Sequence, residues 1–213
     1  MFPLFESIKV VDGQFLNLPW HQRRVERSRE KLSVAGKLDL VSLPEIPQDY
    51  RSGVVKCRVP YGEALGPVEF TKYTNKTINS LQQVECEPFD YSLKYQDRSK
   101  LERLFQYRGA CEEVLITING ILTDTSYSNV VLYDGVRWYT PETPLLEGTQ
   151  RALLLDAGRF QTARIHIDEL GDFQKLVLIN ALVEFEPLHF VPIAGIKLWN
   201  HKQVSFGRTA RPG

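Results

Sequence analysis

Two segments of this sequence carry residues that could act on a carbonyl compound and on an anion. Lys94 lies just before a predicted helix, and a lysine amine that burial or a nearby cation keeps neutral can form a Schiff base. Gly148 precedes an apolar helix, where free backbone N–H groups bind anions and a glycine lets a phosphate approach the backbone closely. Taken alone, each segment also has an ordinary interpretation, as a surface lysine and as a loop that enters a helix.

Two further segments could complete such a site. His21 and Arg24, three residues apart, project from the same side of a predicted helix, and Arg24 could donate charge-assisted hydrogen bonds to a phosphate. Asp124 follows a strand and Asn129 begins the next, so this carboxylate could hold a protonated ring nitrogen. The alternatives are a solvated basic face, because Glu26 lies among the arginines of this helix, and an ordinary turn aspartate.

Other catalytic patterns are missing from the sequence. It contains no GxSxG elbow, no GxGxxG, no P-loop and no HExxH. The three cysteines, Cys57, Cys86 and Cys111, are widely spaced, and the four histidines form neither a triad nor a cluster with them. We therefore expect neither a disulfide framework nor a metal site.

Composition narrows the class of protein. Of the 213 residues, 43% are hydrophobic and 24% charged, which excludes a disordered or fibrous chain. Lys plus Arg equals Asp plus Glu at 26 each, so no overall field attracts nucleic acid or an anionic membrane. The N-terminus lacks the order of a signal peptide, and no apolar run is long enough to span a bilayer. We expect a cytoplasmic protein that acts on a small molecule and binds neither nucleic acid nor membrane.

Three turn signals and several helical patterns define the elements that must position these residues. Asp12-Gly13, Asn119-Gly120 and Asp134-Gly135 each lie between strand-like runs and predict two-residue type I′ hairpins. Residues 113–140 thus read as a four-stranded antiparallel meander. Apolar spacing predicts helices over residues 21–35, ended by Gly36, over 101–108, and over 150–157, ended by Gly158. A short helix is predicted near residues 168–174.

The order of these segments resembles the fold-type IV pyridoxal-phosphate enzymes. This family includes the branched-chain and D-amino-acid aminotransferases and aminodeoxychorismate lyase. The resemblance covers nearly the whole chain. It rests on Phe5-Glu6-Ser7-Ile8-Lys9, His21-x-x-Arg24, Lys94-x-x-x-Arg98, Gly120-Ile-Leu-Thr-Asp124, Ser126-x-x-Asn129, Thr140-Pro141, Leu146-x-Gly148-x-x-Arg151 and Ile179-Asn180-Ala181-Leu182.

The resemblance implies a cofactor, pyridoxal 5′-phosphate, and a role for each matching residue. Lys94 would form the Schiff base and move the substrate proton, while Asp124 would keep the pyridine nitrogen protonated. Arg24 and the backbone N–H groups of Thr149 and Gln150 would hold the phosphate. Arg98 would lower the pKa of the lysine. The residues implied to bind the cofactor are Arg24, Lys94, Asp124, Ser128, Asn129, Gly148, Thr149, Gln150 and Asn180.

The family also implies an architecture. We expect an α+β protein with two domains, similar to D-amino-acid aminotransferase. Residues 1–87 would form a smaller N-terminal α/β sandwich. Residues 88–213 would form a larger antiparallel, β-rich pseudo-barrel with helices that carries the Schiff-base lysine. Because the family builds its site between two domains and completes it with a neighbouring subunit, we also expect a homodimer.

Departures from the family pattern bear on the activity. Asp124 stands where the family usually has glutamate, and the chain begins at what resembles the family's second strand. The Ile-Asn-Ala-Leu segment is more like aminodeoxychorismate lyase, whereas Phe5-Glu6 is more like the transaminases. We expect a lyase that converts 4-amino-4-deoxychorismate to 4-aminobenzoate and pyruvate on the way to folate. The alternatives are an aminotransferase of branched-chain or D-amino acids, and a family member that binds the cofactor without turnover.

Overall fold

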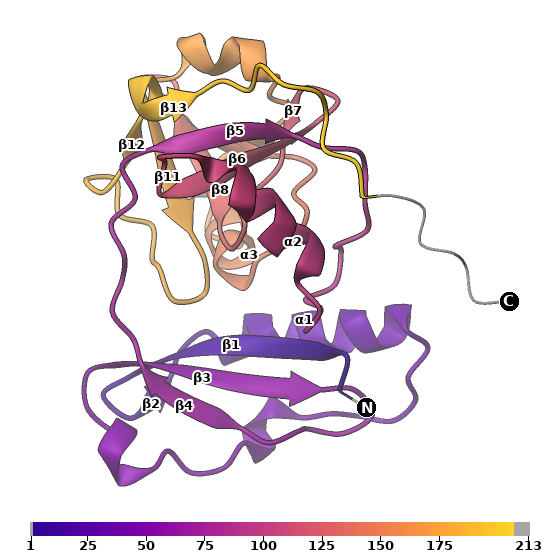
Figure 1. Ribbon diagram of the computed structural model, residues 1–213. Coiled ribbons are helices and arrows are strands. Elements are labelled where there is room, and N and C mark those ends of the chain that lie inside the picture. The colour runs from indigo at the N-terminus through magenta and orange to yellow at the C-terminus, as the bar shows by residue number, and fades with distance from the viewer. Residues whose placement is uncertain (1, 207–213) are drawn as a thin grey trace, which may run out of the picture.

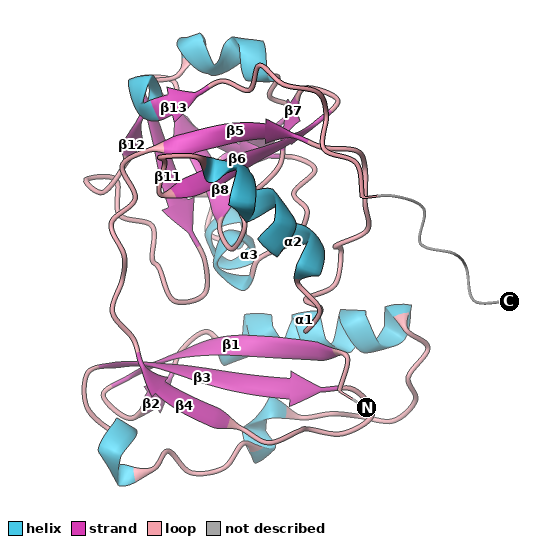
Figure 2. Ribbon diagram, viewed as in Figure 1, coloured by secondary structure: helices cyan, strands magenta, loops and turns pink. Residues whose placement is uncertain are grey.

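The N-terminal part of the chain is one antiparallel sheet with a helix on it. The computed structural model describes residues 2–206, and its lower layer in Figures 1 and 2 contains a sheet of order β2-β1-β3-β4. Alternate residues of β1 and β3, among them Ile8 and Val55, fill a core against α1, which lies between this sheet and the rest of the chain. The elements are β1 (Leu4–Val11), β2 (Gln14–Phe15), α1 (Leu18–Lys31), two 3₁₀ turns (Leu40–Ser42 and Gln48–Tyr50), β3 (Val54–Tyr61) and β4 (Glu69–Lys72).

The remainder forms two more sheets, of order β13-β5-β6-β7 and β10-β9-β8-β11-β12. Both sheets are mixed: the first has two parallel pairs, β13-β5 and β5-β6, and the second has one, β9-β10. With three sheets and few helices, the expected α+β class is confirmed. The elements are β5 (Leu81–Glu85), α2 (Ser99–Phe105) with a 3₁₀ turn (Gln106–Arg108), β6 (Glu113–Ile118), β7 (Ile121–Leu122), β8 (Asn129–Tyr133), β9 (Trp138–Pro141), α3 (Thr149–Asp156), β10 (Gln161–Ala163), a 3₁₀ helix (Ile167–Asp172), β11 (Lys175–Ile179), β12 (Val191–Pro192), a 3₁₀ turn (Ile193–Gly195) and β13 (Ile196–Lys197).

The predicted four-stranded meander over residues 113–140 is wrong. β6 and β7 form one hairpin and β8 and β9 another, but the two hairpins belong to different sheets. Residues 123–128, between the two hairpins, leave the regular strand pairing. Thr125 Oγ1 accepts the N–H of Ser128, at 2.9 Å, and this local hydrogen bond competes with pairing between strands. Only Asp124 and Asn129 still form an isolated bridge. The break places the polar side chains of this segment in the interior.

Two of the three predicted tight turns are confirmed. Asn119 and Gly120 both have positive φ, at 52° and 73°, as a type I′ turn requires, and the Asp12-Gly13 turn is similar. The Asp134-Gly135 turn is different, because Tyr133 pairs with Trp138 and leaves a four-residue loop. The carboxylate of Asp134 accepts two backbone N–H groups within that loop and closes it.

The helices form where the apolar spacing predicts them, except at one end. α1 stops at Lys31 rather than near residue 35, because Ser33 takes a positive φ of 54° and the carbonyl of Arg29 accepts the N–H of Val34. α3 ends just before Gly158, which has a φ of 65°. Within residues 2–206, no helix combines the length and the apolar character needed to cross a membrane.

The predicted division after residue 87 stays a prediction. The sheets change between β4 and β5, since β5 pairs with β6 and β13 and not with the N-terminal sheet. The site described below lies between these two parts.

Candidate active site

Lys94 lies where the N-terminal sheet meets the rest of the chain. Its carbonyl accepts the N–H of Phe5 at the start of β1, at 3.1 Å, and the neighbouring Tyr95 forms a bridge with Leu4. The amine lies 4.9 Å from the centre of the Phe5 ring. Burial, together with the positive charges of Arg24 and Arg98, lowers the pKa of this amine to about 7. A substantial share of Lys94 is therefore a neutral nucleophile near neutrality.

Arg24 is held by a buried carboxylate. Glu6, on β1, accepts from both Nε of Arg24, at 2.8 Å, and Nη2, and its second oxygen lies 2.6 Å from Nδ1 of His21. Burial alone would raise the pKa of Glu6, but Arg24 and His21 outweigh it and lower the pKa to about 2. The remaining Nη1 of Arg24 faces the loop before α3, 3.5 Å from the carbonyl of Glu147. The guanidinium is thus fixed at the edge of that loop.

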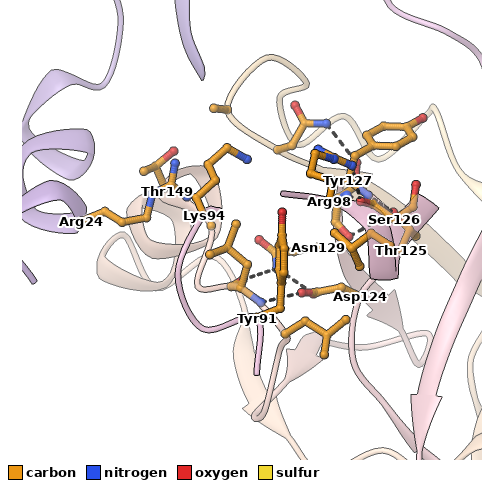
Figure 3. Close-up of a pocket in the computed structure, with 17 residues that line it drawn as sticks. Arg24, Tyr91, Lys94, Arg98, Asp124, Thr125, Ser126, Tyr127, Asn129 and Thr149 are labelled. Carbon is orange, nitrogen blue, oxygen red and sulfur yellow. Dashed lines mark hydrogen bonds between the residues drawn. The ribbon is translucent and has the colours of Figure 1, made fainter. Parts of the chain in front are cut away.

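The N-terminus of α3 is open for an anion. Gly148 precedes the helix in an extended conformation, and no side chain caps the first turn. Its first backbone N–H groups therefore lack helical partners and carry the positive end of the helix dipole. A Cβ at position 148 would collide with Oδ1 of Asn129, so only glycine allows these two segments to approach so closely. Arg24 and Thr149 lie together on one side of Lys94 (Figure 3).

Asp124 forms the opposite part of the site. It is 5% exposed and accepts the amide of Asn129 at 2.7 Å and the N–H of Leu146 at 2.9 Å. Burial raises the pKa of Asp124 to about 6, even though both hydrogen bonds lower it. The amide of Asn129 also donates to the carbonyl of Leu146, so it ties Asp124 to the loop that leads into α3.

Most of the residues predicted from the sequence line one pocket. Gln150 does not: its side-chain oxygen accepts the amide of Asn17 at 3.2 Å, outside the residues that line the pocket. Asn180 donates to the hydroxyl of Ser128, at 2.9 Å, and closes a further wall. Their roles toward a cofactor stay predictions. The predicted residues that line the pocket are Arg24, Lys94, Asp124, Ser128, Asn129, Gly148, Thr149 and Asn180.

Sequence reasoning missed two residues of the site. Tyr91 projects into the centre of the pocket (Figure 3), and its buried hydroxyl has no hydrogen-bond partner among residues 2–206. An orphaned buried hydroxyl of this kind needs a partner from outside the chain, such as a ligand or a water. Glu6 was part of a matching segment, but its role as the partner of Arg24 was not predicted. A carboxylate in the middle of an apolar strand was the signal that could have found it.

Comparison with known proteins agrees with this geometry. A model of the amino-transferase class IV family matches residues 91–190. A crystal structure from Haemophilus somnus, provisionally assigned as a 4-amino-4-deoxychorismate lyase, is 33% identical, with a TM-score of 0.78 over 87% of this chain and 98% of that one. The chain belongs to the aminotransferase class IV family.

Two further similar proteins extend the comparison. An uncharacterised protein of Haemophilus influenzae is 38% identical over 185 residues, which are 85% of this chain and 98% of that protein. The pyridoxal-phosphate-bound form of a Mycobacterium tuberculosis protein described as a hypothetical aminotransferase is 16% identical, with a TM-score of 0.68 over 91% of this chain and 81% of that one. The last comparison supports the fold alone.

Proposed function

We propose that this class IV protein is a pyridoxal-phosphate-dependent lyase that converts 4-amino-4-deoxychorismate to 4-aminobenzoate and pyruvate. The observation that carries the proposal is one pocket that combines a lysine with a pKa of about 7, a buried carboxyl group and an anion-binding helix N-terminus. These are the nucleophile, the ring-nitrogen partner and the phosphate site that such a reaction requires. The similarity to the Haemophilus somnus protein supports the choice of a lyase.

The donor set fits pyridoxal 5′-phosphate. Arg24 and the uncapped N-terminus of α3 would hold the phosphate, Asp124 the ring nitrogen and Lys94 the carbonyl carbon, and the orphaned hydroxyl of Tyr91 indicates that the pocket takes a polar group. When bound, the cofactor supplies an electron-withdrawing ring that stabilises negative charge next to the substrate nitrogen.

Lys94 would move the protons of the reaction. Because burial and the neighbouring arginines lower the pKa of its amine to about 7, the neutral form is accessible near neutrality and can accept the proton from the ring carbon that bears the substrate's amino group. That C–H bond and the C–O bond to the neighbouring enolpyruvyl group break, the electron pair completes the aromatic ring, and the enol takes up a proton as it becomes pyruvate. Atoms balance without an oxidant, and the protonated Lys94 would deliver the proton that the enol carbon receives.

The wall near the C-terminus favours the lyase over an aminotransferase. Asn180 and Ala181, from the lyase-like Ile-Asn-Ala-Leu segment, both line the pocket. The side-chain oxygen Oδ1 of Asn180 accepts the N–H groups of Leu182 and Val183, at 2.8 and 3.0 Å, and fixes the turn. We infer that this wall bounds the substrate. The expected homodimer rests on the family resemblance and is testable by light scattering.

A spectrum followed by chemical trapping tests the proposal. Purified protein mixed with pyridoxal phosphate should become yellow, and borohydride followed by peptide mapping should place the reduced adduct on Lys94. The control is K100Q, which alters a lysine at the start of α2 that does not line the pocket, and it should form the same adduct on Lys94. Release of pyruvate and 4-aminobenzoate from 4-amino-4-deoxychorismate supports the lyase. An adduct elsewhere refutes the proposal, amino transfer to a keto acid would make the protein an aminotransferase, and bound cofactor without turnover would make it a non-catalytic member.

A further inference from the structure

We infer that Arg98 is a second anion-binding residue of this pocket and that it takes an anionic oxygen, either a carboxylate of the substrate or the ionised ring hydroxyl of the cofactor. The inference rests on the proposed function, since that function names the two groups. Arg98 lies beside Tyr127 and Ser126, on the other side of Lys94 from Arg24 and Thr149 (Figure 3). The two guanidinium groups therefore occupy opposite ends of the same pocket.

The two arginines differ in what neutralises them. Arg24 donates two hydrogen bonds to the carboxylate of Glu6. Arg98 donates to a neutral acceptor, the carbonyl of Ser126, at 2.8 Å, and forms no ion pair in the part of the chain that the structure describes. A cation in a partly buried pocket is stabilised by an opposite charge. A bound anion is the group that would supply it here.

Glu113, a buried carboxyl group that shares a cavity wall with Arg98, is engaged elsewhere. Glu113 lines a second cavity together with Arg98, but it accepts the hydroxyl of Ser126 at 2.9 Å and the N–H of Val114 at 2.8 Å. Burial raises the pKa of Glu113, which also weakens it as a counter-ion. Glu113 therefore holds Ser126, and the carbonyl of Ser126 in turn holds one side of the Arg98 guanidinium.

This arrangement leaves the guanidinium fixed on one side and able to donate from the other. A planar guanidinium binds a carboxylate through two parallel hydrogen bonds, or a single ionised oxygen through one. The hydroxyl of Tyr91, which lines the same pocket, has no partner among the described residues and could donate a further bond. The substrate of the proposed lyase carries a carboxylate on its ring, which 4-aminobenzoate keeps, and this end of the pocket fits that group.

R98Q and R98K test the inference, with R103Q as the matched control. Arg103 lies on the exposed side of α2 and does not line the pocket. The first measurement compares the affinity of the pyridoxal-phosphate-loaded enzyme for 4-aminobenzoate and for aniline, which lacks the carboxylate. The second follows the pH at which the visible absorbance of the loaded enzyme titrates.

The two sources of the anion give different results. If Arg98 binds the substrate carboxylate, R98Q weakens binding of 4-aminobenzoate by about tenfold or more and leaves aniline unchanged, and R98K recovers part of the loss. If it binds the ring oxygen, R98Q raises the pH of the absorbance transition by about one unit or more, because the ionised form loses its cation. R98Q that matches R103Q in both measurements overturns the inference. Wild-type protein that forms no adduct on Lys94 refutes the proposed function instead.

Discussion

Two buried carboxyl groups, Glu6 behind Arg24 and Asp124 in the wall of the pocket, have opposite pKa shifts. Glu6, which is fully buried, has its pKa lowered to about 2, whereas Asp124, which is 5% exposed, has its pKa raised to about 6. Burial alone raises the pKa of both. The difference therefore comes from their partners and not from their depth.

Glu6 has a charged partner, Arg24, beside the neutral ring of His21, whereas both hydrogen-bond donors to Asp124 are neutral. Glu6 forms two hydrogen bonds with Arg24 and one with His21, so the chain itself supplies its counter-ion. Asp124 accepts from an amide and a backbone N–H, and the positive charge of Arg151 offsets its burial only in part. Glu6 therefore has its counter-ion within the chain, while Asp124 forms no ion pair among residues 2–206, and a cationic group of a ligand would complete that part of the site. A protonated pyridine nitrogen is such a group.

The largest effect is expected from E6Q. Removing the carboxylate leaves the buried Arg24 without its counter-ion, which costs about 3–5 kcal/mol of unfolding free energy. E30Q, on an exposed position of the same helix as Arg24, should change stability by less than about 0.5 kcal/mol. Urea unfolding at pH 7 measures both. Equal stabilities would show that Glu6 does not compensate Arg24.

A second test compares how the stability of E6Q and of the wild-type protein depends on pH. Because folding lowers the pKa of Glu6 from 4.5 to about 2, its contribution is complete above about pH 4.5 and is lost as the pH falls toward 2. The shift corresponds to about 3 kcal/mol. E6Q should therefore be less sensitive to acid than the wild-type protein over this range.

At the other end, D124N is expected to impair turnover more than cofactor binding. Replacing the carboxylate removes the charge that favours a protonated ring nitrogen, so kcat should fall about 100-fold. The phosphate end is unchanged, so the affinity for pyridoxal phosphate should fall by less than about tenfold. Absorbance titration and pyruvate release measure the two quantities. A loss confined to affinity would contradict the division of roles between the two ends.

The pH dependence of stability, measured without cofactor, independently tests the raised pKa of Asp124. Folding raises its pKa from 3.8 to about 6, so the wild-type protein loses stability as the pH rises through this range and the carboxyl group ionises. D124N does not ionise. The difference in stability between the two proteins should therefore change from pH 4 to pH 7 in favour of D124N.

The contrast between the two carboxyl groups also shows how far the sequence could be used. The motif order brought Arg24, Lys94, Asp124 and Gly148 to attention, and all four line the pocket. Nothing local predicts that Glu6 pairs with Arg24, because one residue is on a strand and the other on a helix that follows a turn. Whether such a carboxylate ends beside a cation or beside neutral donors depends on tertiary packing, and so does its pKa.

Sheet membership shows the same limit in the fold. Turn residues at Asn119-Gly120 predicted a hairpin that forms, because a type I′ turn is specified by two adjacent residues. The sequence pattern could not show that the next hairpin, β8-β9, belongs to a different sheet, because alternation of apolar residues does not determine which strand lies alongside. The pairing of β5 with β13, more than 100 residues apart, is likewise not encoded locally.

G148A tests the contact between Gly148 and Asn129, which connects the phosphate end of the pocket with Asp124. Its expected effect on stability is intermediate in size. The added methyl group would meet Oδ1 of Asn129, whose amide is held by Asp124 and by the carbonyl of Leu146, so the side chain cannot move freely. Overpacking of this kind costs about 2 kcal/mol. The displaced loop should also weaken binding of pyridoxal phosphate. The double variant G148A/N129A removes the colliding atom, and failure to recover stability relative to N129A would place the cause elsewhere.

T149V should have the smallest effect on folding and separates stability from binding at the phosphate end. Burial lowers the pKa of His21, so its ring is neutral and Nδ1–H donates to Glu6, which leaves Nε2 to accept the hydroxyl of Thr149 at 3.5 Å. Loss of so long a hydrogen bond should cost about 1 kcal/mol or less. Affinity for pyridoxal phosphate should fall further if the hydroxyl donates its single proton to the phosphate instead of to His21 once the cofactor is bound, and T149S should restore it. A loss of stability as large as that of E6Q would instead mean that the contact with His21 is part of what holds the Glu6–Arg24 pair together.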